Sequence, residues 1–175
     1  MKACFMGLGY IGLPTAIIAA KHGIKVTGVD INPSVVELTN QGKLHIVEPG
    51  LEAYLQEVVK TGNLKASLKP ETCEAYFMVV PTPFKGNHEP DISYVEAATR
   101  SVLPLLKAGD LYVIESTSPI GTTEKMRDLI YGERPELKDK IYIAYCPERV
   151  LPGNVIYELV HNDRVIGGIN EASTD

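Results

Sequence analysis

Short apolar runs alternate along the chain with longer segments in which apolar residues recur every three or four positions. The runs are too short for helices, and few polar residues interrupt them, as in strands that are buried on both faces of a sheet. They predict strands at residues 3–6, 25–30, 75–80, 111–115, 141–146 and 164–169, with a further short strand at 64–68.

The longer segments between these strands have the spacing of amphipathic helices. Start signals support two of them, because Asn32 precedes Pro33 and because Asp91 and Ser93 precede a strongly periodic stretch. Helices are predicted at 14–22, 33–41, 51–59, 92–106 and 122–131. Regular alternation of apolar strands with helices predicts an α/β fold, a doubly wound parallel sheet with helices on both faces.

The first predicted strand runs directly into a glycine-rich turn, "KACFMGLGYIGLPTAI", with glycines at Gly7, Gly9 and Gly12. The second strand, "KVTGVD", ends at Asp30, 18 residues after Gly12. In a Rossmann-type dinucleotide fold the first glycine permits the tight turn and the second lets the backbone approach the pyrophosphate. The third lets the helix pack closely on the strand.

This turn and Asp30 together predict NAD as cofactor. The helix N-terminus offers free amides to phosphates, and the carboxylate accepts hydrogen bonds from ribose hydroxyls while repelling a 2′-phosphate. Ile31 and Asn32 follow Asp30, and this stretch has no arginine that would favour NADP. The alternative is that the glycines only form a turn and Asp30 only ends a strand. A P-loop is disfavoured because no Gly-Lys-Ser/Thr follows.

Three further loops follow predicted strands at the edge where open α/β sheets bind ligands. In "VVPTPFKGNHEPD" the hydroxyl of Thr82 is placed to contact a cofactor, and "ESTSPIGTTEK" is rich in hydroxyls. Local turn and N-cap bonding is the alternative role for residues 117–123. In "YCPERVLPGN" the charges of Glu148 and Arg149 indicate a polar ligand, with a salt bridge to a neighbouring helix as the alternative.

Composition limits the size and partners of the protein. The chain has 175 residues, of which 45% are hydrophobic and 22% charged, which predicts one globular domain over residues 1–175. A net charge of −5 without a dense basic block argues against nucleic acid or anionic membrane partners. With no apolar run near roughly 20 residues and no signal-peptide pattern, we expect a cytoplasmic protein. The final "GGINEASTD" suggests a domain of something longer.

Cysteines and histidines add no catalytic or metal site. Cys4, Cys73 and Cys146 are an odd number at wide spacings, which predicts reduced thiols and neither a disulfide framework nor a zinc site. A nucleophilic role for Cys146, with Arg149 supplying positive charge, is disfavoured because this cysteine ends an apolar strand. The four histidines lack a paired acid or ligand at suitable spacing, so we expect structural or solvated roles and no metal.

Six strings together resemble the UDP-glucose/GDP-mannose dehydrogenase family. They are "GLGYIGLP", "GVDIN", "GKLHIVEPGL", "VPTPFKGNHEPD", "ESTSPIGTTEKM" and "IAYCPERVLPGN", and the likeness extends to "NDRVIGG". The resemblance implies an NAD-binding Rossmann domain, followed in the family by a central helical region and a C-terminal nucleotide-sugar domain. It implies oxidation of the sugar C6 alcohol to a carboxylate in two NAD-dependent steps through an enzyme thioester.

The resemblance also implies site residues. Those expected to line the NAD site beside the three glycines are Tyr10, Ile11, Asp30, Val35, Thr82 and Thr117. Those expected at the sugar nucleotide are Glu148, Arg149 and Val150.

The family's nucleophilic cysteine, lysine and asparagine are expected beyond Asp175, so this chain alone should have no catalytic residue and no activity. UDP-glucose dehydrogenases carry a second glutamate where this chain has Pro152. This departure favours UDP-N-acetyl-D-mannosamine as the substrate and UDP-N-acetyl-D-mannosaminuronate as the product. We expect the full-length enzyme to be a homo-oligomer that acts in polysaccharide biosynthesis. The alternative function is a stand-alone NAD-binding sensor or regulatory module without catalysis.

Overall fold

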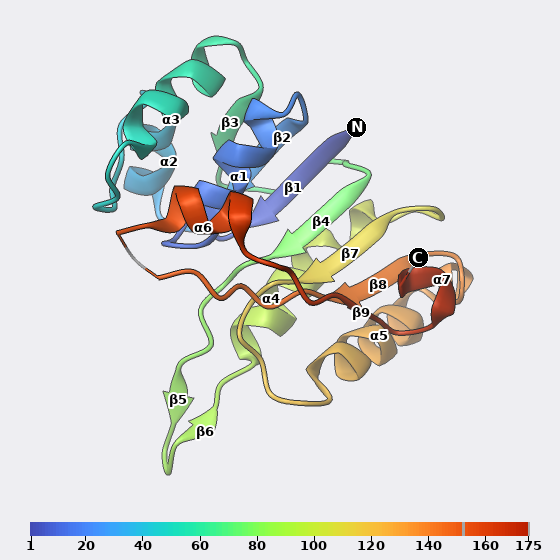
Figure 1. The fold of residues 1–175 in the computed structure, drawn as a ribbon. Coiled ribbons are helices and arrows are strands. Elements are labelled where there is room, and N and C mark those ends of the chain that lie inside the picture. Colours follow the sequence, from blue (N-terminus) through green and yellow to red (C-terminus); the bar gives the residue numbers. More distant parts are fainter. Residues whose placement is uncertain (152, 175) are drawn as a thin grey trace.

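A computed structural model describes residues 1–151 and 153–174 and shows one large sheet between two layers of helices (Figure 1). Its strands lie in the order β3-β2-β1-β4-β7-β8-β9. All pair in parallel except β9, which is antiparallel to β8. Their bounds are β1 Lys2–Met6, β2 Lys25–Val29, β3 Leu64–Ser67, β4 Ala75–Met78, β7 Leu111–Ile114, β8 Tyr142–Tyr145 and β9 Gly167–Gly168. This order confirms the doubly wound Rossmann-type fold.

Helices cover the two faces of the sheet in two groups, each with its own buried core. On one face α1 and α3 pack against residues such as Phe5 and Leu64, and on the other α4 and α5 pack against residues such as Met78 and Ile114. The helices of the first group are α1 (Gly12–Lys21), α2 (Pro33–Asn40) and α3 (Leu51–Lys60). Those of the second are α4 (Ser93–Val102) and α5 (Thr122–Glu133), with 3₁₀ turns η1 (Leu103–Leu105) and η2 (Pro135–Leu137).

Local signals start two of these helices as the sequence predicts. The Asn32 side chain accepts a hydrogen bond from the Ser34 amide at 3.0 Å, and Pro33 occupies the first turn of α2. Asp91 likewise accepts from the Ser93 amide at 2.9 Å at the start of α4. Each carboxylate or amide oxygen satisfies a donor that has no partner within the helix.

The strand predicted at 164–169 is wrong over most of its length. Only Gly167–Gly168 pairs with the sheet, and it pairs antiparallel to β8. A Cβ on Gly168 would lie 2.4 Å from the Ser173 carbonyl carbon, so a close contact with α7 (Glu171–Thr174) requires glycine here. Residues 162–166 lie outside helix and strand, and within them the side chain of Arg164 forms ion pairs with Glu115 after β7 and with Glu148 in the loop after β8.

Two features inside predicted loops were not expected. A hairpin of β5 (Phe84–Lys85) and β6 (Glu89–Pro90) extends from the end of β4, away from the helical layers (Figure 1). A short helix, α6 (Val155–His161), follows the β8 loop and lies near α1. Both are too short to be recognised from periodicity.

Candidate functional site

The sheet order places the predicted site residues in a row along one edge, where the parallel strands end. Asp30 follows β2, the glycine turn follows β1, Thr82 follows β4, Thr117 follows β7 and Glu148 follows β8. From β2 to β8 this row covers four strand spacings, about 19 Å. The connections leave in opposite directions from β1 and β4, so the row crosses the point where α/β sheets bind ligands.

The glycines of the turn have different surroundings. Gly7 has φ +103°, and a Cβ there would lie 2.5 Å from the Val79 carbonyl oxygen. A Cβ on Gly12 would lie 2.0 Å from the Gly7 carbonyl oxygen, so these two glycines allow the turn and its packing. At Gly9 a Cβ would meet no heavy atom within 4 Å. Gly9 therefore leaves open space beside the N-terminus of α1, which is the cradle that a pyrophosphate requires.

The carboxylate of Asp30 is held by the turn. One oxygen accepts from the Leu8 amide at 3.0 Å, and the other accepts from the Asn32 amide at 2.9 Å. Asp30 is partly exposed, and each carboxylate oxygen can accept a second hydrogen bond. The acid is therefore fixed beside the glycine turn with acceptor capacity left for a ligand hydroxyl.

A cavity of about 360 Å³ beside Asp30 has mostly apolar walls. It is lined by Met6, Gly7, Val29, Asp30, Ile31, Leu68, Val80, Pro81, Tyr94, Ala97, Ala98 and Ser101. Ile31, directly after the acid, is 90% exposed. The sequence did not reveal this apolar wall, because its residues come from five separate segments. The exposed isoleucine is the one local signal. The cavity has the size and the apolar lining to hold a flat, largely apolar group beside Asp30.

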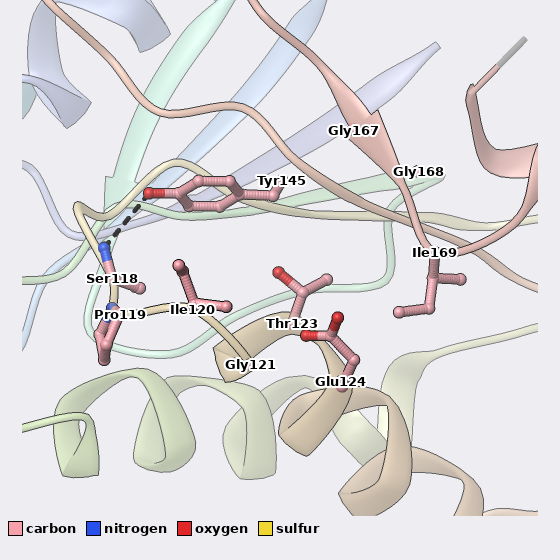
Figure 2. Close-up of a pocket in the computed structure, with 10 residues that line it drawn as sticks. All are labelled: Ser118, Pro119, Ile120, Gly121, Thr123, Glu124, Tyr145, Gly167, Gly168 and Ile169. Carbon is pink, nitrogen blue, oxygen red and sulfur yellow. Dashed lines mark hydrogen bonds between the residues drawn. The ribbon is translucent and has the colours of Figure 1, made fainter.

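A second cavity, of about 270 Å³, lies between the N-terminus of α5 and β9 (Figure 2). The Tyr145 side chain extends along this cavity, and its hydroxyl accepts a hydrogen bond from the Ser118 amide at 3.3 Å. Thr123 and Glu124 of α5 line the opposite side. This cavity contains neither the glycine turn nor Asp30. Of these two cavities, the one of 360 Å³ is lined by predicted cofactor residues, Gly7 and Asp30.

The loops after β4 and β7 are joined by hydroxyl groups. Thr82 donates to the Thr117 carbonyl oxygen at 2.6 Å, and Ser116 donates to the Val80 carbonyl oxygen at 2.7 Å. Thr122 donates to the Pro119 carbonyl oxygen at 2.7 Å, which is the local turn bonding considered as the alternative for this segment. Thr82 and Thr117 are thus held side by side in the middle of the row.

Three other residues implied by the resemblance lie within the turn or on α2. Tyr10 is 49% exposed, directly after Gly9. Ile11 immediately precedes α1, and Val35 lies on α2, and both are partly buried against the core of that face. Their contact with NAD stays a prediction.

The loop after β8 holds its two charged residues differently. The side chain of Glu148 is 4% exposed and forms an ion pair with Arg164. The Arg149 amide donates to Glu148 Oε1 at 2.7 Å, and its guanidinium donates to the Asp163 carbonyl oxygen at 2.8 Å. Glu148 therefore forms the salt bridge that was considered as the alternative to ligand binding. Its partner, Arg164, lies in a loop and not on a neighbouring helix. Arg149 is exposed and Val150 is partly buried.

Arg164 also contacts Glu115 and Cys146, and sequence analysis missed this cluster. Its Nη2 lies 2.5 Å from Glu115 Oε1 and 3.3 Å from Cys146 Sγ. Arg164, and not Arg149, is thus the cation beside Cys146. Burial raises the pKa of the Glu115 carboxyl, because the loss of solvation outweighs the attraction of the guanidinium.

Glu48 was also missed, although it anchors the same loop. Its side chain is buried, and its two oxygens accept from the Gly153 and Val155 amides at 2.8 Å each. The acid thereby joins the "HIVEPG" segment to the start of α6. Its only sequence signal is its position before Pro49 and Gly50, which does not reveal the partner.

The described part of the chain contains no helix that is long and apolar enough to cross a bilayer. Within residues 1–151 and 153–174, no group of three or more histidine, cysteine or acidic side chains is arranged to hold a metal ion.

Comparisons with known proteins agree on one family. The model of the UDP-glucose/GDP-mannose dehydrogenase family, NAD binding domain, matches residues 1–175. The UDP-N-acetyl-D-mannosamine dehydrogenase of Campylobacter jejuni is 53% identical over 97% of this chain and 44% of its own length. The NDP-N-acetyl-D-galactosaminuronic acid dehydrogenase of Ralstonia nicotianae is 51% identical over 94% of this chain and 41% of its own.

Among solved structures, the UDP-N-acetyl-mannosamine dehydrogenase Cap5O of Staphylococcus aureus matches with a TM-score of 0.94 and 43% identity. The match covers 99% of this chain and 43% of that protein. The chain spans less than half the length of the curated relatives it matches. It belongs to the UDP-glucose/GDP-mannose dehydrogenase family, as the NAD-binding domain.

Proposed function

We propose that the protein to which this domain belongs oxidises the C6 alcohol of UDP-N-acetyl-D-mannosamine to the carboxylate, using two NAD per sugar. Residues 1–175 supply the NAD site and one wall of the sugar-nucleotide site. The observation that carries the proposal is the row along the sheet edge, from Asp30 through the glycine turn to Glu148 and Arg149. The relatives' names support the substrate.

The residues of the row divide the binding work. Asp30 accepts from the adenosine ribose, the apolar cavity beside it takes the adenine, and the open space at Gly9 takes the pyrophosphate. Bound NAD supplies the hydride acceptor. Thr82 and Thr117 then lie toward the nicotinamide end, one strand from the loop that contains Glu148 and Arg149.

At the far end of the row the guanidinium of Arg149 is exposed and offers donors to sugar or phosphate oxygens. Removing four electrons from a primary alcohol requires two hydride transfers, which explains the two NAD. From the family resemblance we expect the thioester-forming cysteine outside residues 1–175. Cys4, Cys73 and Cys146 are all buried. We further propose that the full-length enzyme is a homo-oligomer, that it is cytoplasmic and that it acts in polysaccharide biosynthesis.

A stand-alone NAD sensor is less favoured, because the similarity to dehydrogenases extends through the β8 loop, which a purely NAD-binding module does not need. The identity of the sugar needs its own test, since the relative named for N-acetyl-D-galactosaminuronic acid is 51% identical to this chain and the UDP-N-acetyl-D-mannosamine dehydrogenase is 53% identical. Activity assays should therefore compare the N-acetyl-mannosamine and N-acetyl-galactosamine nucleotides.

Cofactor binding can be tested on this chain by calorimetric titration. We expect tighter binding of NAD(H) than of NADP(H), because the Asp30 carboxylate repels a 2′-phosphate. Asp30→Ala should narrow that preference, whereas Asp128→Ala on the exposed side of α5 should leave it unchanged. Equal affinity for both cofactors in the unaltered chain would contradict the role of Asp30.

A further inference from the structure

Arg164 connects two buried glutamates that lie at the ends of neighbouring strands. It lies between α6 and β9, and its side chain is 27% exposed. One terminal nitrogen bonds Glu115 at the end of β7, and the other bonds Glu148 in the loop after β8. The side chains of the two glutamates are 2% and 4% exposed. A single guanidinium thus joins three segments that are distant in sequence.

The same short segment also holds Arg149. The Asp163 carbonyl accepts from the Arg149 guanidinium at 2.8 Å, one residue before Arg164. The free oxygen of Glu148 accepts from the Arg149 amide at 2.7 Å, so both oxygens of this carboxylate are occupied. Asp163 and Arg164 therefore hold Arg149 and Glu148 respectively, and the ion pair with Glu115 fixes Arg164 to the end of β7.

We propose that Arg164 is a positioning residue for the sugar-nucleotide side of the site, which it serves by fixing the Glu148 carboxylate with Glu115 as its buried anchor. The inference rests on the proposed function for what the loop binds. This role requires an arginine at position 164, because a planar guanidinium presents separate nitrogens to two carboxylates in a fixed geometry. A lysine ammonium is a single point charge on a flexible stem.

The competing account is that Arg164 only neutralises buried charge and so stabilises the whole domain. The amide of Arg149 separates the two accounts, because its partner is the carboxylate that Arg164 holds. The amide of Val155 provides an internal reference, since it bonds Glu48 and not the cluster. Arg100 provides a matched control, because it also bridges two glutamates, Glu96 and Glu133, on the exposed surface between α4 and α5.

The first experiment measures amide hydrogen exchange of this chain by NMR. In the Arg164→Lys variant we expect the Arg149 amide to exchange at least about tenfold faster, while the Val155 amide stays within about twofold. Arg100→Lys should change neither amide. An Arg149 amide that is unprotected in the unaltered chain, or equally protected in both, overturns the proposal. So does a uniform loss of protection that includes the core amides of β7.

The second experiment measures steady-state kinetics of the full-length enzyme with UDP-N-acetyl-D-mannosamine. Arg164→Lys should raise KM for the sugar nucleotide about tenfold and leave KM for NAD within about twofold. Equal rises of both constants with a lowered melting temperature identify a purely structural role. If the unaltered enzyme oxidises no nucleotide sugar, the proposed function fails. The exchange of the Arg149 amide still decides whether Arg164 positions Glu148.

Discussion

At the scale of single residues, Glu115 shows how burial and pairing compete. One carboxylate oxygen bonds Arg164, and the other has no hydrogen-bond partner among the described residues. Glu148 shares the same guanidinium, so two buried carboxylates face one cation. Burial therefore raises the pKa of the Glu115 carboxyl, and the folded state favours its protonated form relative to the unfolded state.

A pH prediction follows for Glu115→Gln. Because the folded pKa is raised, the stability that Glu115 contributes is present in acid and is lost as the pH rises above the ordinary value of 4.5. Glutamine mimics the protonated acid at every pH. We expect the variant to melt roughly 2–4 °C above the unaltered chain at neutral pH, the shift that about 1 kcal/mol produces at this size.

Thermal melting across pH 4 to 8 checks this expectation. The advantage of Glu115→Gln should shrink as the pH falls toward 4.5. Glu89→Gln, a charge removal in the exposed hairpin, should show no such trend. A variant that is less stable than the unaltered chain at neutral pH would mean that the ion pair with Arg164 outweighs the burial cost.

At the scale of elements, α6 depends on a residue more than 100 positions earlier in the chain. It has seven residues, too few for an independently stable helix. The buried Glu48 carboxylate accepts from two amides at its start, where negative charge is favoured by the helix dipole. This tertiary cap holds both α6 and the end of the loop that contains Glu148.

We expect Glu48→Ala to loosen α6 locally. Losing charge-assisted bonds to two amides should cost at least about 2 kcal/mol, which corresponds to roughly 30-fold faster exchange of amides within α6. Amides of β1 should keep their protection. Hydrogen exchange measured by NMR or mass spectrometry gives both values for one sample.

Glu57→Ala is the control, because among the described residues the exposed Glu57 side chain pairs with Lys21 alone, at the surface. It should leave α6 unchanged. Unaltered exchange in α6 of Glu48→Ala would show that packing against α1, and not Glu48, stabilises this helix.

At the scale of the whole molecule, the proposal assigns the whole NAD site to this domain but only one wall of the sugar site. We therefore expect the 175-residue chain to bind NAD and to oxidise no UDP-N-acetyl-D-mannosamine. The full-length enzyme should release two NADH per sugar, measured by NADH absorbance and by chromatography of the uronate. Turnover by residues 1–175 alone at a comparable rate would place the nucleophile within this domain and refute the division proposed here.

Local rules determined most of the fold. The cap at Asn32 and the apolar runs of β1 and β4 act over a few residues, so the sequence alone predicted these elements. The glycine turn belongs to this class only in part. Gly12 packs against the Gly7 carbonyl oxygen five residues earlier, but both glycines also face Val79, which follows β4 and is distant in sequence. The turn's position between strand and helix, followed by Asp30, was sufficient to predict the Rossmann-type fold and NAD as cofactor.

Tertiary structure alone decided which charged residues act together. Arg164 reaches Glu115 across 49 positions, and Glu48 reaches Gly153 across 105. No periodicity or spacing records such pairs, since they form only when the sheet brings the ends of its strands to one edge. The run at 164–169 satisfied the local criteria for a strand, yet β9 retains two residues. The two buried carboxylates need a cation, and Arg164 supplies it from a segment that lies outside the strand.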